Sequence, residues 1–200
     1  MIQKAIKLKT KIETREDLVD ICRGVFTKYG YHKTTIDDIA LAVGKGKSTL
    51  YYYFTGKDEM YKAVIELELS ELKKRLLTEV NKNHDPQSKI KAYILTRMET
   101  ISDYKVLYLA VKEQSKSRFA ESDNIHQIFK VQEIQILTEI LEAGVNEGYF
   151  TIQEPEFAAI GLIAAIRGIE LKLFSNIRKP GFDKTLDNLL EIVLYGVIKN

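Results

Sequence analysis

The sequence predicts an all-α fold, and three observations support that prediction. Apolar residues recur every three to four positions in each long segment, and no segment alternates as a half-buried strand does. Only three prolines and eleven glycines interrupt the 200 residues. With 45% hydrophobic residues, a chain of this length buries a sizeable core. We expect about nine helices in two domains, residues 1–57 and residues 58–200.

The first expected helix spans residues 15–29 and follows a basic segment, residues 1–12. Gly30 ends this helix. The single cysteine, Cys22, lies on its apolar face, so we expect a small core residue without a disulfide partner in the chain, in a reducing cytoplasm. The residues expected to face the core are Leu18, Ile21, Cys22, Val25, Phe26 and Tyr29.

Two short helices joined by a turn are expected between residues 35 and 54. Thr35 and Asp38 have the spacing of a capping box at the start of the first helix. Gly44 stands where a helix ends in a left-handed residue, and the second helix begins at Gly46 or Lys47. A short connection that contains glycine is typical of a helix-turn-helix. The apolar stripe of the first helix is Ile36, Ile39, Ala40 and Val43.

The second helix of this pair combines an apolar inner face with many polar side chains. Leu50 and Phe54 have i, i+4 spacing and are expected to face the core. So many hydroxyl donors and cations on a short helix favour contact with nucleic acid, although each tyrosine could instead pack inside the domain. The candidate DNA-binding residues are Thr35, Lys45, Lys47, Ser48, Thr49, Tyr51, Tyr52, Tyr53 and Lys57.

The charge distribution supports this interpretation. Residues 1–57 carry 11 lysines and arginines and 6 acids, a net charge of +5, whereas the whole chain has a net charge of only +2. The remainder is therefore mildly acidic. A basic region could simply be a solvated surface, but here it coincides with the helix-turn-helix, which favours nucleic-acid binding.

A phosphate-binding loop is a competing interpretation of the glycine-rich turn. Gly46, Lys47 and Ser48 match the end of the pattern G-x-x-x-x-G-K-[ST], but its first glycine would fall on Leu41. That motif also follows a buried strand, whereas a helix is expected before this turn. The nucleotide-hydrolase interpretation is therefore disfavoured.

The rest of the chain also indicates helices only. We expect them at residues 58–83, 87–103, 104–119, 124–147, 155–175 and 183–199. The most apolar run, residues 157–166, is too short to cross a bilayer, and no N-terminal signal peptide is evident. The expected location is therefore the cytoplasm.

Residues 13–65 resemble the DNA-binding domain of TetR-family transcriptional regulators. The matching segments are 18–26, 30–31, 34–40, 43–44, 49–54 and 57–59. Residues 66–200 share with the family only their length, helical character and apolar C-terminal helices. One departure lies in the turn, where Lys45, Gly46, Lys47 and Ser48 occupy the places of the family's usual hydrophobic residue, serine, lysine and glycine. The base preference of relatives therefore cannot be transferred to this chain.

The resemblance implies a ligand-responsive repressor that acts as a homodimer on a palindromic operator in double-stranded DNA. The second helix of the pair would then lie in the major groove. Lys47 is our candidate for a base-edge contact, with Tyr51 beside it in the groove. The expected phosphate contacts come from Thr35, Thr49, Tyr52, Tyr53 and Lys57.

The C-terminal part is expected to provide dimerisation and ligand binding. Its two last helices are apolar over wide faces, so they need burial on the core and on a partner subunit, unless the chain is a monomer with a thick core. Arg167, in apolar surroundings, requires a carboxylate such as Glu99, Glu113 or Glu170, or an anionic ligand. The candidate pocket residues, each of which could be ordinary core, are Tyr93, Arg97, Met98, Tyr104, Tyr108, Phe129 and Arg167.

Catalytic and metal sites are not expected. The three histidines, His32, His84 and His126, have no metal-binding spacing, and the common hydrolase and zinc motifs are missing from the sequence. We therefore expect neither an enzyme nor a cofactor. An all-helical adaptor that binds another protein is the alternative function, but it would leave the lysine- and tyrosine-rich helix unexplained.

Overall fold

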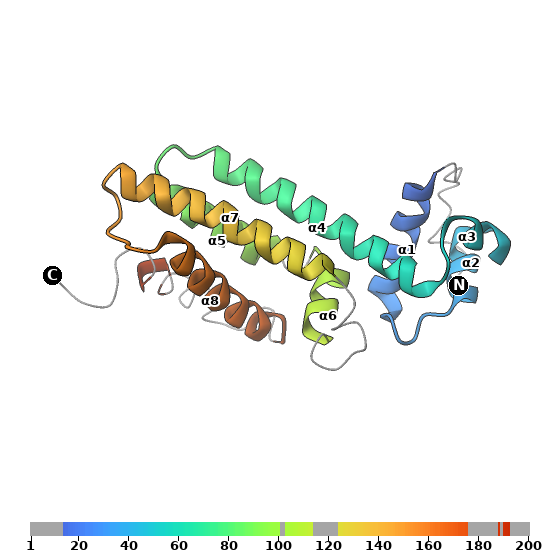
Figure 1. The fold of residues 1–200 in the computed structure, drawn as a ribbon. Coiled ribbons are helices and arrows are strands. Elements are labelled where there is room, and N and C mark those ends of the chain that lie inside the picture. The colour runs from blue at the N-terminus through green and yellow to red at the C-terminus, as the bar shows by residue number, and fades with distance from the viewer. Residues whose placement is uncertain (1–13, 101–102, 114–123, 176–187, 189, 193–200) are drawn as a thin grey trace. The chain divides into compact units, whose positions relative to one another are not determined.

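The computed structural model describes residues 14–100, 103–113, 124–175, 188 and 190–192, and among these residues there are helices and no strands (Figure 1). The all-α prediction is therefore confirmed. Of the helix expected at residues 183–199, only residues 188 and 190–192 are described, and they are helical. The helices with defined bounds are α1 (Arg15–Tyr29), α2 (Ile36–Val43), α3 (Lys47–Tyr53), α4 (Lys57–Asn81), α5 (Pro86–Thr100), α6 (Lys105–Glu113), α7 (Asn124–Asn146) and α8 (Pro155–Ser175).

The chain divides into two compact units. The first comprises Met1–Glu68 and Lys105–Ala110, and the second comprises Leu69–Tyr104 and Val111–Asn200. Helix α4 contributes its first part to one unit and its second part to the other. The expected domain boundary after residue 57 stays a prediction and falls where α4 begins.

In the first unit, α1 packs against α2, and α2 packs against α3. Cys22 is fully buried, and burial raises the pKa of its thiol to about 12, so the predicted role as a core residue is confirmed. The prediction that Tyr29 faces the core is wrong, because 47% of the residue is exposed and the ammonium of Lys28 lies over its ring. The last turn of α1 thus carries Tyr29 away from the core. The buried apolar residues of α1 to α3 are Leu18, Val19, Cys22, Val25, Phe26, Ile39, Val43 and Leu50.

In the second unit, α5 packs against α7, and α7 packs against α8 (Figure 1). The apolar side of the second half of α4 is buried and consists of Leu69, Leu72, Leu76 and Val80. Gly144 of α7 is required by packing, because a Cβ there would lie 2.1 Å from the ring of Phe150. Within the described ranges, none of the helices has the length and apolar content that crossing a bilayer requires.

Candidate functional site

Helix α2 begins and ends with the local structures that its sequence predicts. The backbone N–H of Asp38 donates to the Thr35 hydroxyl at 3.2 Å, and the backbone N–H of Thr35 donates to the Asp38 carboxylate at 2.8 Å. These bonds complete the capping box. The Thr35 hydroxyl also donates to the Asp38 carboxylate at 2.6 Å, and this bond together with the one from the backbone N–H of Thr35 lowers the pKa of Asp38. Gly44 ends the helix in the left-handed conformation, with a φ of 69°. The helix-turn-helix geometry is therefore as predicted.

Helix α3 turns its apolar residues inward and its polar residues outward. Leu50 and Phe54 are buried, as expected. Tyr51 and Tyr52 are 53% and 81% exposed, which excludes core packing for these two rings. Tyr53 is half-buried, and its ring meets the edge of Tyr52 at a centroid distance of 4.8 Å. Among the other candidate DNA-binding residues, Thr35, Lys45, Lys47 and Ser48 are exposed, and Thr49 is half-buried.

Lys47, the candidate for base contact, forms an ion pair across the turn. Its Nζ lies 2.8 Å from Oδ1 of Asp37, in the first turn of α2. The hydrogen bond and the charge of Asp37 raise the pKa of Lys47. Sequence reasoning missed this contact, because it depends on the angle between α2 and α3.

Lys57 lies against the backbone of the α1–α2 connection. Its Nζ donates to the carbonyl oxygens of Tyr31 and Thr34, each at 3.0 Å, and sits 4.2 Å from the centroid of the Tyr31 ring. The Tyr31 hydroxyl in turn donates to Asp58 at 2.5 Å. The expected phosphate contact of Lys57 stays a prediction, and the structure adds an internal role that joins α4 to this connection.

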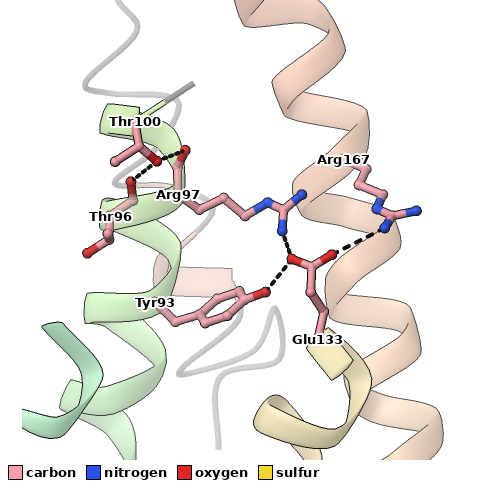
Figure 2. A network of polar contacts seen from close by, with 6 residues as sticks. All are labelled: Tyr93, Thr96, Arg97, Thr100, Glu133 and Arg167. Atoms are coloured by element: carbon pink, nitrogen blue, oxygen red, sulfur yellow. Dashed lines mark hydrogen bonds and ion pairs between the residues drawn. The ribbon is translucent and has the colours of Figure 1, made fainter. Parts of the chain in front are cut away.

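The second unit contains a buried polar network centred on Glu133 of α7 (Figure 2). The Tyr93 hydroxyl of α5 donates to Oε1 of Glu133 at 2.7 Å. Arg97 of α5 forms an ion pair with the same oxygen, and Nη2 of Arg167 on α8 lies 3.2 Å from Oε2. One carboxylate thus joins three helices. It needs these hydrogen-bonding and positively charged partners, because a buried charge without partners is costly.

Glu133 is the functional candidate that sequence reasoning missed. Among the side chains that the structure describes, Glu133 is the carboxylate bound by Arg167, whereas Glu99 is exposed. The side chains of Glu113 and Glu170 lie outside the description. A signal was present, because Glu133 shares an apolar helix face with Leu137 and Ile140 at i+4 and i+7.

Three of the candidate pocket residues meet at one carboxylate. Figure 2 shows Tyr93, Arg97 and Arg167 directed toward Glu133. Met98 is also buried on α5. Tyr104 lies near Glu71 and Arg75, and burial is the main cause of its raised pKa. Tyr108 is buried in the first unit, and the side chain of Phe129 lies outside the described residues.

A second buried carboxylate lies in the first unit. Glu68 of α4 accepts a hydrogen bond from the backbone N–H of Leu107 at 2.6 Å. Leu107 is in the first turn of α6, where backbone N–H groups lack partners within the helix. The carboxylate therefore ties the start of α6 to α4.

Comparison with known proteins places these features in a family context. Residues 18–64 match the family model described as bacterial regulatory proteins, tetR family. The HTH-type transcriptional repressor KstR2 of Rhodococcus jostii is 24% identical over 192 residues, which cover 92% of this chain and 90% of that protein.

Two solved structures share the fold over nearly the whole chain. The regulator FadR from Bacillus subtilis, in complex with stearoyl-CoA, has a TM-score of 0.73 at 20% identity and covers 92% of this chain and 100% of its own. AibR in complex with isovaleryl coenzyme A and operator DNA has a TM-score of 0.67 at 14% identity and covers 92% of this chain and 98% of its own. At these identities, the likeness establishes a common fold.

Proposed function

We propose that the chain is a TetR-family regulator, a ligand-responsive repressor that binds operator DNA as a homodimer. The outward-facing surface of α3 is the observation that supports DNA binding most strongly. With the turn before it, α3 presents two lysines, hydroxyl groups and two exposed tyrosines, next to the capped helix α2. The alternative function, a protein-interaction adaptor, does not explain this combination of residues.

DNA recognition divides between base contacts and phosphate contacts. Lys47 lies at the first position of α3, where the recognition helix of a helix-turn-helix contacts base edges, and Tyr51 lies one turn further along. Thr35, Lys45, Ser48, Thr49, Tyr52 and Tyr53 surround this pair and supply donors to phosphates. Lys57 reaches a phosphate only if its ammonium leaves the carbonyls of Tyr31 and Thr34.

The DNA-binding proposal is tested by fluorescence anisotropy on labelled duplex at several salt concentrations. We expect affinity to fall steeply as salt rises, because phosphate contacts release counterions. Replacing Lys45 with methionine is expected to flatten that dependence by about one. Binding that is independent of salt would favour the adaptor instead.

Dimerisation is proposed through an exposed apolar face of α8. Its inner residues, including Ile163 and Ile166, are buried on the core. The opposite side exposes Phe157 to 71% together with small residues, and a Cβ at Gly161 would meet open space. Small residues allow close approach of a second helix, and a second copy of the chain is the occupant we propose. This face, the α8 face, consists of Phe157, Ile160, Gly161, Ala164 and Gly168.

Sedimentation velocity at micromolar concentration tests this part of the proposal. The wild-type chain should sediment as a dimer, and Ala164→Arg should shift it to monomer because a charge would be buried in the interface. Val131→Arg is the matched control, since Val131 is an exposed apolar residue of α7 outside the α8 face. A monomeric wild type would contradict the homodimer.

A small-molecule effector is proposed to act through the second unit. The FadR and AibR structures hold acyl-CoA esters, so we propose an acyl-CoA ester for this chain too. The anionic groups of such a ligand would suit the arginines Arg97 and Arg167. Binding to the conformation that does not fit the operator would then release DNA by a population shift.

The effector proposal is tested with a series of CoA esters from isovaleryl-CoA to stearoyl-CoA, with free CoA as the control. A ligand that binds should raise the melting temperature of the protein and weaken its affinity for duplex DNA. If no ester changes either quantity, this class of effector is excluded while DNA binding stands.

A further inference from the structure

We propose that Asp37 is a positioning residue for DNA sequence recognition, which aims the side chain of Lys47 at a base edge. The inference rests on the proposed function, because it assigns a role within the same recognition surface. Its basis is the contact between Oδ1 of Asp37 and Nζ of Lys47, at 2.8 Å. This contact joins the two helices of the helix-turn-helix on their solvent side.

The two adjacent acids at the start of α2 have different partners. Asp38 is engaged by Thr35, whose hydroxyl donates to its carboxylate at 2.6 Å and whose backbone N–H donates at 2.8 Å. Asp37 is not part of this cap and reaches across the turn to the first residue of α3. The capping role of Asp38 therefore leaves Asp37 available for Lys47.

The exposure of the pair indicates a role in recognition and not in stability. The side chains of Lys47 and Asp37 are 51% and 74% exposed. Exposed ion pairs contribute little to folding stability, because water screens them and two side chains must be ordered. A carboxylate on a surface that meets phosphates also lowers the affinity for every duplex. Its expected benefit is therefore selectivity.

The flexibility of the lysine side chain explains why a positioning residue would be needed. Its ammonium is a flexible point charge on a four-carbon stem, unlike the planar fork of arginine, and by itself it attracts any phosphate. A fixed carboxylate restricts the stem and partly cancels the charge. Since α3 has no acid of its own in the first turn and no side-chain cap at Gly46, Asp37 is placed to supply this restraint.

The experiment compares the wild type, Asp37→Asn, Lys47→Met and Asp20→Asn by selection from a pool of randomised duplexes, followed by anisotropy on the selected and on scrambled duplexes. Asp20→Asn is the matched control. Asp20 is also an exposed aspartate of the first unit, paired with Arg23 at 2.8 Å, and its replacement changes the net charge by the same amount. Circular dichroism checks that each variant is folded.

Asp37→Asn is expected to relax the base preference at the same position that Lys47→Met relaxes. It should also raise affinity for the scrambled duplex several-fold and steepen the salt dependence by up to about one, because the lysine charge is released toward phosphates. Asp20→Asn should leave the selected motif unchanged. A motif that Asp37→Asn leaves identical to the wild type would overturn the positioning role, even if affinity rises for all duplexes. A wild type that enriches no sequence would overturn the proposed function itself.

Discussion

The chain uses charged side chains in two opposite settings. Lys45 in the turn and Lys47 on α3 are exposed, and both members of the pair of Lys47 with Asp37 are exposed. Around Glu133 the carboxylate is fully buried and is bound by Tyr93, Arg97 and Arg167 from two neighbouring helices. Water screens the first setting and not the second. Substitutions on α3 should therefore change recognition with little effect on stability, whereas substitutions at Glu133 should change stability first.

The largest effect is expected from Glu133→Leu. Removal of the carboxylate leaves the guanidinium of Arg97 buried without this partner, which typically costs roughly 3–5 kcal/mol of unfolding free energy. Urea denaturation followed by circular dichroism measures the change. Glu139→Leu is the control on the same helix, because Glu139 is exposed and contacts only Gln135 among the hydrogen bonds described. Equal stability of the two variants would refute the structural importance of the network.

Lys47→Ala should show the converse behaviour. We expect operator affinity to fall roughly ten- to a hundredfold at the preferred site, with relaxed preference at one base pair, because one base-edge contact is lost. The denaturation midpoint should stay that of the wild type. Anisotropy on selected and scrambled duplexes measures the first quantity. An equal loss on both duplexes would show that Lys47 contacts a phosphate.

Thr35→Ala is expected to have an intermediate effect on stability. It removes the hydroxyl that caps α2 and should cost about 1 kcal/mol. Thr35→Ser, which retains the hydroxyl, is the matched control. If both variants lose the same stability, the methyl group and not the cap is responsible.

A smaller effect is expected from acid. Hydrogen bonds from the hydroxyl and backbone N–H of Thr35 lower the pKa of Asp38, and hydrogen bonds from the backbone N–H and hydroxyl of Thr55 lower the pKa of Glu59. Each carboxylate therefore contributes stability that is complete above its pKa in the unfolded chain and is lost as pH falls through its pKa in the folded protein. The first unit should therefore lose stability at pH values below about 4. Asp38→Asn should weaken this pH dependence, and an unchanged acid titration would contradict the assignment of Asp38.

Much of the fold was predictable because local rules decide it. The capping box of Thr35, the left-handed Gly44 and the inward placement of Leu50 depend on neighbours within one or two turns, and each is found as expected. The same periodicity predicted that Tyr29 is buried, and this was wrong because Tyr29 lies in the last turn of α1, where the core ends. Helical spacing alone does not show where a helix leaves the core.

The side-chain partners were less predictable, because they depend on how helices pack. Glu133 lies 34 residues before Arg167 and 40 after Tyr93, and periodicity does not match an acid to a base across helices. The same limit applies to Lys57, whose acceptors are backbone carbonyls that every residue possesses. Sequence reasoning identified three members of the network and missed the residue at its centre.

Selection of bound duplexes from a random pool by the wild-type chain tests the central claim most directly. A dimer that presents two copies of α3 should enrich a motif of two inverted half-sites, with centres separated by about one turn of B-DNA. Enrichment of no sequence, or of a single half-site without symmetry, would contradict a homodimeric DNA-binding repressor.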